Sequence, residues 1–425
     1  MATRLAATIA LLACAAAPAL AQAPSTIAPE RVGMSSERLG RLDAAMQALV
    51  DSSRAAGVAS LVLRDGHVVH SAAYGWSDRE AGRPLRTDAL FRIASQTKAL
   101  TSVAAMILVE EGRLTLTDPV WRWVPAFQRM SVATDSGPVP ARRALRVRDL
   151  LTHSAGLSYG TDALVREAYE AAGLGPAAGV GWYFADKDEP ICVTMDRLGT
   201  LPLVAQPGDR FVYGYGTDLL GCVVERVSGQ SLDAFLRERI LEPLGMDDTY
   251  FYVPEGERSR LATLYAAGDD GLQRAPDGPR GQGEYVDGPR VSYSGGAGLV
   301  STLGDYGRFL QMLLNGGELD GVRILSPYGV SLMTRDHLGP SYGQAGLGFG
   351  LGFQVLTDPA LAGRFGAPGA YGWGGAYATS YWVDPAERLV VVLMTQTMPA
   401  GPLNLGALRD LVYAAVEEPA ALERH

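Results

Sequence analysis

Residues 91–112 read FRIASQTKALTSVAAMILVEEG, a stretch that combines a predicted helix with a candidate catalytic pair. The second half predicts a helix that ends at Gly112, because glycine is the usual residue just beyond a helix C-terminus. Near the start, Ser95-Gln96-Thr97-Lys98 has the form S-x-x-K. If the helix begins near Ser95, residues i and i+3 share one face and the lysine amine reaches the serine hydroxyl. The helix N-terminus also favours negative charge on a serine oxygen, so the stretch predicts a nucleophile and its base.

Lysine is scarce in this chain, which favours a chemical role for Lys98. The 37 basic residues include only two lysines, Lys98 and Lys187. An arginine guanidinium stays protonated, whereas a desolvated amine can lose its proton and act as a base. Lys187 stands in the polar stretch ADKDEP and is interpreted as a surface residue. A structural ion pair is the alternative interpretation of Lys98.

Composition excludes several classes of partner. The chain has 425 residues, of which 47% are hydrophobic and 20% charged, with a net charge of −9. These values are typical of a globular enzyme, and the acidic balance argues against nucleic acid or anionic membrane as a partner. The histidines are scattered and no C-x-x-C pair occurs, so we expect no metal and no cofactor.

The N-terminal residues have the features of an export signal. Arg4 is followed by the apolar stretch 5–17, which is too short to span a bilayer, and by Ala19-Leu20-Ala21 as a cleavage site. We expect residues 1–21 to be a signal peptide and the mature enzyme to be periplasmic or secreted, with no stable membrane span. A lipoprotein site at Cys14 is the alternative. Of the mature cysteines, Cys222 is expected in the core, and whether it pairs with Cys192 stays open.

The order of elements predicts one antiparallel sheet built from both ends of the chain. Strand-like runs at 58–63 and 67–75 are joined by Asp65-Gly66, a strong hairpin signal. Further strand-like runs occupy 346–356, 378–385 and 388–397, and amphipathic helices are expected at 38–53 and 405–418. The middle of the chain reads mainly as short helices. The predicted fold is therefore of the α/β (α+β) class, with an α/β lobe at about 28–92 and 291–415, an inserted helical lobe at about 93–290, and a cleft between them.

A second motif competes with Ser95 for the role of nucleophile. Residues 156–160 read GLSYG and match G-x-S-x-G, the nucleophile elbow of another class of hydrolases. That mechanism needs a strand before the serine and Asp then His after it, but the preceding RVRDLLTH is helical in pattern. The downstream histidines are only His337 and the terminal His425. We interpret Ser158 as a turn residue.

The chain from about 28 to 415 resembles the serine β-lactamase-like superfamily, and specifically the family VIII carboxylesterases, which are similar to class C β-lactamases and DD-peptidases. Three motifs in the family's order carry the resemblance. They are Ser95-x-x-Lys98, then Tyr213 in QPGDRFVYGYGTDLLG at the family's Y-x-N position, and Trp373-Gly374-Gly375 at the K-T-G position. The resemblance implies a β-lactamase/DD-peptidase-like fold and acyl transfer through the serine.

The same resemblance implies a role for each motif residue. Ser95 would attack an acyl carbonyl, Lys98 would take its proton, and Tyr213 would relay a proton to the leaving group. The oxyanion hole would consist of the backbone N–H groups of Ser95 and Ala376. Trp373, Gly374 and Gly375 would line the substrate site, with Tyr215 beside them.

Two departures from the β-lactamase pattern point to the substrate. Tyr215 replaces the asparagine of Y-x-N, and Trp373 replaces the lysine of K-T-G. Both changes make the predicted cleft more aromatic and less cationic, which favours neutral short-chain esters over penicillins or D-Ala peptides. The alternatives are a β-lactamase, a D-amino-acid peptidase, an acyltransferase that uses an alcohol, or a non-catalytic cell-wall receptor. Chain length of the acyl group and oligomeric state cannot be derived from the sequence.

Overall fold

The computed structural model describes residues 27–175, 187–278, 281–399 and 403–420. The expected signal peptide, residues 1–21, and the alternative lipoprotein site at Cys14 lie outside these ranges. Every helix within them is too short or too polar to cross a membrane.

An antiparallel sheet of both chain ends forms the centre of the described structure, as expected. Its eight strands, counted in the described residues, run in the order β12-β13-β14-β15-β16-β1-β2-β3. The N-terminal part supplies β1 (Gly57–Arg64), β2 (His67–Asp78) and β3 (Arg83–Pro84). The C-terminal part supplies β12 (Leu347–Phe349), β13 (Gln354–Leu356), β14 (Tyr371–Gly375), β15 (Thr379–Asp384) and β16 (Leu389–Thr395).

The two ends meet because the most apolar strands pair in the middle of the sheet. β1 pairs with β16 from Val58↔Thr395 to Arg64↔Leu389, and both strands are buried along their whole length. Strands buried on both faces read as continuous apolar runs, as VVVL in β16 does. The hairpin between β1 and β2 turns at Asp65 and Gly66, whose φ angles of 54° and 79° are those that a tight two-residue turn requires.

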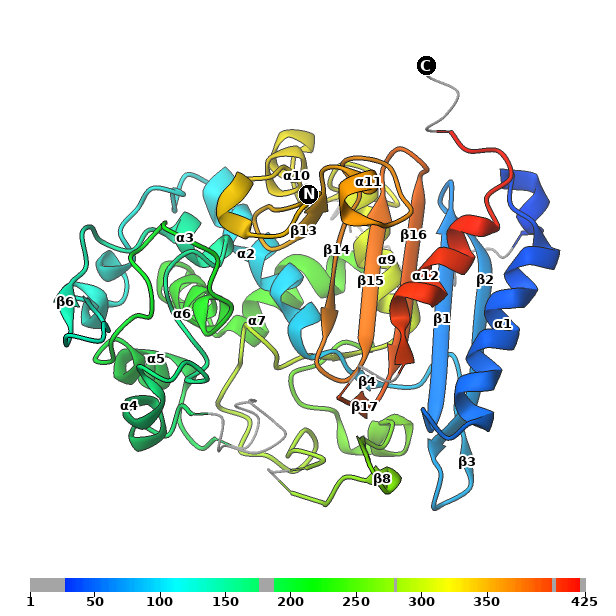
Figure 1. Ribbon diagram of the computed structural model, residues 1–425, viewed down its shortest axis with the longest axis horizontal. Coiled ribbons are helices and arrows are strands. Elements are labelled where there is room, and N and C mark those ends of the chain that lie inside the picture. The colour runs from blue at the N-terminus through cyan, green and yellow to red at the C-terminus, as the bar shows by residue number, and fades with distance from the viewer. Residues whose placement is uncertain (1–26, 176–186, 279–280, 400–402, 421–425) are drawn as a thin grey trace, which may run out of the picture.

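Helices cover both faces of the sheet (Figure 1). On the near face, α1 (Ser36–Asp51) packs against α12 (Leu405–Ala414). On the opposite face, α9 (Leu303–Leu314) packs against β1 and β16, and α2 (Thr97–Glu110) continues the same core. The hydrophobic core is therefore divided by the sheet into two layers.

The segment between the two ends of the chain is mainly helical, and its labelled helices lie to the left of the sheet in Figure 1. Its helices are α3 (Val147–Leu151), α4 (Arg166–Ala171), α5 (Ile191–Leu198), α6 (Gly216–Ser228), α7 (Leu232–Leu236) and α8 (Glu242–Leu244). The segment also holds strand pairs that the sequence pattern did not predict: β5 (Ser131–Val132) with β6 (Val139–Pro140), and β7 (Tyr265–Gly268) with β8 (Gly271–Arg274). Two short helices of the C-terminal part, α10 (Pro327–Met333) and α11 (Pro359–Ala362), lie at the top of the view in Figure 1.

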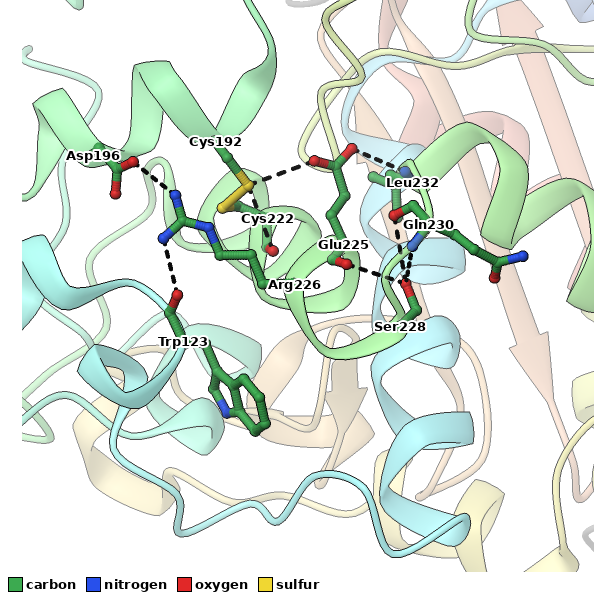
Figure 2. The surroundings of a disulfide bond; sticks show 9 residues. All are labelled: Trp123, Cys192, Asp196, Cys222, Glu225, Arg226, Ser228, Gln230 and Leu232. Carbon is green, nitrogen blue, oxygen red and sulfur yellow. Dashed lines mark hydrogen bonds and ion pairs between the residues drawn. A yellow bond between two sulfur atoms is a disulfide. The ribbon is translucent and has the colours of Figure 1, made fainter.

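A disulfide between Cys192 and Cys222 joins α5 to α6. The pairing, open at the level of sequence, is therefore present in the structure, and Cys222 is also fully buried as expected. Figure 2 shows the bond beside Glu225, with Arg226 of α6 tied to Asp196 of α5. The loop that the disulfide closes spans 30 residues and contains the whole second motif around Tyr213.

Candidate active site

Ser95 lies at the start of α2, in a short 3-10 turn (Ala94–Gln96) that leads into the helix. The lysine amine at position 98 lies 3.3 Å from the Ser95 hydroxyl, as the i, i+3 spacing predicts. Ala94, directly before the serine, has a φ of 45° and is completely buried. A non-glycine residue in the left-handed region is strained, and such strain is concentrated at functional sites. The backbone thus holds the serine in one position at the N-terminal end of α2.

The Lys98 amine has three close partners. It lies 3.0 Å from the Tyr159 hydroxyl and donates to the Gly296 carbonyl at 2.7 Å, besides its contact with Ser95. A neutral amine has two N–H donors and one lone pair, so it can donate to Gly296 and Tyr159 and accept from the serine hydroxyl. The side chain is 2% exposed, which removes the water that would compete for its lone pair. This arrangement suits a base that takes the serine proton.

Asp218 of α6 holds the segment that contains Gly296. Its carboxylate accepts hydrogen bonds from the Gly296 N–H and from the Ser294 hydroxyl. Burial raises the pKa of Asp218, while the Lys98 charge and these hydrogen bonds act in the opposite direction. A Cβ on Gly296 would lie 2.3 Å from the carboxylate, so glycine is needed for this close approach. Asp218 thereby positions the Gly296 carbonyl, which accepts the hydrogen bond from the Lys98 amine.

The Tyr213 ring, and not its hydroxyl group, faces the Lys98 amine. Its ring centroid lies 4.8 Å from the Lys98 nitrogen, and its hydroxyl accepts a hydrogen bond of 3.1 Å from the Trp373 indole. This leaves the tyrosine hydrogen available to another acceptor. Tyr213 and Trp373 both line the cavity that contains Ser95, as the sequence predicts.

His153 packs behind Tyr213, with the two ring centroids 4.8 Å apart. The side chain is buried, and burial together with the nearby Lys98 charge holds the pKa of His153 well below its usual value. The ring is therefore neutral and places no positive charge of its own beside the Lys98 amine. Sequence reasoning did not assign His153 a role.

The third motif forms strand β14, which ends against the backbone that precedes the serine. A Cβ on Gly375 would lie 2.4 Å from the Ile93 carbonyl oxygen and 2.2 Å from the Thr379 hydroxyl. Only glycine allows this approach, which brings Ala376, the next residue, into the same cavity lining as Ser95. The placement is compatible with the predicted oxyanion hole of the Ser95 and Ala376 amides. The cavity has a volume of 470 Å³, and Gly374 and Gly375 also line it.

Tyr215 does not occupy the place that sequence analysis expected. It is 3% exposed, is absent from the cavity lining, and donates its hydroxyl hydrogen to the Leu174 carbonyl at 2.9 Å. The chain enters α6 at the next residue, which turns this side chain inward, where it packs edge-on against Tyr159. Tyr215 thus supports Tyr159 from behind instead of facing the cavity.

The competing G-x-S-x-G stretch is a turn. Helix α3, not a strand, precedes it, and the buried Ser158 hydroxyl accepts a hydrogen bond from the Gly160 N–H. The same stretch supplies Tyr159, the partner of Lys98 that sequence reasoning missed. No local pattern could have identified it, because 61 residues separate the two positions.

Within the described ranges, no three His, Cys, Asp or Glu side chains lie grouped so that they could hold a metal ion.

Comparison with known proteins identifies the family. The model of the beta-lactamase family matches residues 42–415. The chain belongs to the beta-lactamase family. It is a serine hydrolase of that fold, as the S-x-x-K, tyrosine and W-G-G motifs indicated.

Three relatives illustrate the range of the family. Esterase EstB of Burkholderia gladioli is 37% identical over 392 residues, which cover 88% of this chain and 95% of EstB. The lovastatin esterase of Penicillium rubens is 32% identical over 380 residues, which cover 82% of this chain and 90% of that protein. The solved structure of EstCE1, described as a hydrolase with promiscuous acyltransferase activity, superposes with a TM-score of 0.74 at 29% identity and covers 88% of this chain and 98% of its own.

Proposed function

We propose that the protein is a carboxylesterase that cleaves short-chain esters through an acyl-enzyme on Ser95. The observation that carries the proposal is the contact of Ser95 with a buried lysine in a cavity whose third-motif side chain is the Trp373 indole. An indole beside the nucleophile offers no cation for a β-lactam or peptide carboxylate, and its apolar surface suits neutral groups. The names of EstB and of lovastatin esterase support the same substrate class.

The proposed reaction uses these groups in turn. The Ser95 oxygen attacks the ester carbonyl carbon while the Lys98 amine takes the hydroxyl proton, and the Ser95 and Ala376 amides receive the negative oxygen. When the C–O bond to the alcohol breaks, Tyr213 gives its proton to the leaving oxygen and regains one from Lys98. Water then attacks the acyl-enzyme by the reverse path, which releases the acid and restores Ser95.

A substrate panel tests this proposal. We expect kcat/KM for 4-nitrophenyl butyrate to exceed that for a chromogenic cephalosporin by at least about a hundredfold, and D-Ala-D-Ala peptides to be cleaved more slowly still. A cephalosporin turned over faster than the ester would reject the esterase proposal in favour of a β-lactamase. A short alcohol is then added as a second acyl acceptor. Faster consumption of the ester, together with a new ester of that alcohol detected by chromatography, would favour an acyltransferase. The description of EstCE1 mentions acyltransferase activity.

We also propose that the protein is exported and that the signal peptide is removed after Ala21. The disulfide between Cys192 and Cys222 supports export, because structural disulfides persist in oxidising compartments. Expression of the full chain in a bacterial host, followed by N-terminal sequencing of the periplasmic fraction, should give a mature chain that begins at Gln22. Recovery of the uncleaved chain from the cytoplasm alone would reject this proposal.

A further inference from the structure

A second cavity, separate from the one that contains Ser95, lies beside α7. Its volume is 430 Å³, within the range of about 300–1,000 Å³ that is typical of small-molecule sites. The residues that line it all belong to the described part of the chain, and they do not line the Ser95 cavity. They come from α7 and the turns after it, from the loop at 246–252 and from the loop at 290–293. We refer to this space as the α7 cavity.

The helical wall of the α7 cavity contains an unusual turn. Helix α7 continues as a π-helical turn (Arg237–Leu241), which leads into α8. Asp233, Arg237 and Leu241 are spaced by four residues, so they share one face, and all three line the cavity. Turns of the π-helix are rare and are often found at functional sites. This wall therefore presents a carboxylate, a guanidinium group and an apolar side chain to the same space.

Three tyrosines, Tyr250, Tyr252 and Tyr293, add aromatic surface to the cavity. The rings of Tyr252 and Tyr293 meet edge-on, with their centroids 6.0 Å apart. The Tyr252 hydroxyl donates to the Ser292 carbonyl at 3.0 Å, and the Tyr293 hydroxyl donates to the Arg290 carbonyl at 2.8 Å. Because these hydroxyl hydrogens are bonded to the backbone, the rings offer mainly π surface, which suits an apolar group or an ammonium group.

Two opposite charges at the cavity have no charged partner. Asp233 is half-buried, and among the described residues its carboxylate takes part in no hydrogen bond or ion pair. The Arg290 guanidinium donates through one terminal nitrogen to the carbonyls of Val253 and Val286, and it forms no ion pair with a described carboxylate. These two bonds hold the guanidinium in place and leave its other N–H groups for a ligand.

Both signs of charge act on the same ring. Burial raises the pKa of the Tyr293 hydroxyl, and the Asp233 and Glu225 carboxylates raise it further. The Arg290 and Arg237 charges lower it. A ligand with one charge that lies against Tyr293 is attracted by one of these groups and repelled by another, whereas a short zwitterion can satisfy both.

The remaining surface of the cavity includes an apolar part. Leu241 and Met246 are buried and line it. Arg237 pairs with Glu242 at 3.7 Å, so Arg290 is the better partner for a ligand carboxylate. A ligand that matches these surroundings has an ammonium group, a carboxylate close to it, and an apolar side chain.

We propose that the α7 cavity binds an α-amino acid with an apolar side chain, whose ammonium group lies at Asp233 and whose carboxylate lies at Arg290. The side chain packs against Leu241 and Met246. The loop at 290–293 continues to Gly296, whose carbonyl accepts the hydrogen bond from Lys98, so the ligand lies beside the segment that carries this carbonyl. The proposal does not depend on the esterase function, because the two cavities share no residue.

Three related ligands test the need for both charges. Isothermal titration calorimetry compares phenylalanine, in both enantiomers, with 3-phenylpropionate, which lacks the ammonium group, and with 2-phenylethylamine, which lacks the carboxylate. We expect a Kd below about 1 mM for the tighter-binding enantiomer of phenylalanine. Each analogue should bind at least about tenfold more weakly, because it loses one charge-assisted hydrogen bond.

Two substitutions assign each charge of the ligand to one residue. Asp233→Asn and Arg290→Gln should each weaken the binding of phenylalanine by roughly tenfold to a hundredfold. Asp233→Asn should also remove the advantage of phenylalanine over 3-phenylpropionate, and Arg290→Gln its advantage over 2-phenylethylamine. A change in folding alone would not produce this crossed pattern.

Matched controls separate charge recognition from effects on the fold. Asp51→Asn and Arg335→Gln change exposed residues outside the cavity and should leave every Kd unchanged. Thermal melts without ligand show whether each variant is folded. Because Arg290 also bonds to the Val253 and Val286 carbonyls, Asp233→Asn decides the outcome if the Arg290 variant melts earlier than the parent.

Three results would overturn the proposal. The first is no heat of binding with either enantiomer of phenylalanine up to about 10 mM. The second is equal affinity for phenylalanine and for one of the analogues with a single charge, which would mean that the cavity recognises a simple cation or anion. The third is binding of phenylalanine that folded Asp233→Asn leaves unchanged, which would place the ligand elsewhere on the protein.

Discussion

Two tyrosine hydroxyls surround the Ser95–Lys98 pair, and they face different environments. Tyr159 is bonded directly to the Lys98 amine, but it is not part of the cavity lining. Tyr213 lines the cavity and receives a hydrogen bond from Trp373. A relay to the leaving group must reach the substrate, so the position of Tyr213 suits the relay, and the position of Tyr159 suits a role in orienting the lysine.

This difference predicts unequal effects of removing each hydroxyl. Tyr213→Phe should lower kcat/KM for 4-nitrophenyl butyrate by about 10²–10⁴-fold, the usual contribution of a general acid–base group. Tyr159→Phe should lower it by roughly tenfold, because Lys98 keeps Ser95 and Gly296 as partners. Steady-state kinetics on the two variants are sufficient. The reverse order would make Tyr159 the relay.

The same site shows which residues the sequence could predict. Ser95, Lys98 and Tyr213 stand in motifs with fixed spacing, and the structure brings them together, although their catalytic roles stay a prediction. Tyr159 and Asp218 were not predicted, because their contacts with the lysine and with the Gly296 segment join positions far apart in the chain. Tyr215 was expected at the cavity from its motif position, but the start of α6 turns it inward.

At the scale of elements, β14 is the strand on which the site depends. Gly375 approaches the Ile93 carbonyl so closely that Gly375→Ala should displace the end of β14 from the nucleophile. Since this widens the predicted oxyanion hole, we expect kcat to fall by about 10²-fold or more, as for loss of one oxyanion donor. A thermal melt and kinetics on the same preparation distinguish a displaced strand from an unfolded protein.

A second glycine provides the matched control. Gly40 lies exposed within α1, and an added Cβ would meet nothing within 4 Å. Gly40→Ala should therefore retain full activity and raise the free energy of unfolding by about 0.5–1 kcal/mol, since alanine favours the helix. If Gly375→Ala were as active as Gly40→Ala, the close packing of β14 against the nucleophile would have no catalytic role.

The disulfide is the covalent link between two elements of the helical segment. Because it restricts the unfolded chain, the double substitution Cys192→Ser with Cys222→Ser should lower the free energy of unfolding by about 2–4 kcal/mol. Denaturant titration of parent and variant measures the difference. A reducing agent should destabilise the parent and leave the variant unchanged; equal stability of both proteins would contradict a structural role.

The elements that the sequence predicted are those with strong local patterns. The hairpin of β1 and β2 and the helices α1, α2 and α12 lie close to their expected positions. Strand β14 was not expected as a strand, because the glycines in YGWGG weaken any strand pattern and only pairing with β15 holds it in the sheet. The run 346–356, expected as one strand, is two strands, since the chain turns between β12 and β13.

At the scale of the whole molecule, stability should depend on a buried carboxyl group outside the cavity lining. Burial raises the pKa of Asp305, at the start of α9, to about 6, while hydrogen bonds from Thr249 and Asp248 oppose this and the nearby carboxylates reinforce it. Between pH 3.8 and 6 the folded state binds this proton more tightly than the unfolded state does, so this group destabilises the fold progressively as pH rises through that range.

Asp305→Asn keeps an oxygen that can accept both hydrogen bonds and removes the charge. The stability of the variant relative to the parent should therefore increase from pH 4 to about pH 6.5 and then stay constant. Urea titrations at pH 4, 5, 6 and 7 provide the comparison. A difference that does not change with pH would show that Asp305 does not titrate in this range.

Ser95 is the proposed catalytic nucleophile, and covalent labelling tests this role most directly. A fluorophosphonate probe reacts with an activated serine, and peptide mapping by mass spectrometry then locates the adduct. We predict one label, on the peptide that contains Ser95, and its loss in both Ser95→Ala and Lys98→Arg but not in Ser158→Ala. A label on Ser158, or no labelled serine in an active or folded preparation, would contradict the account.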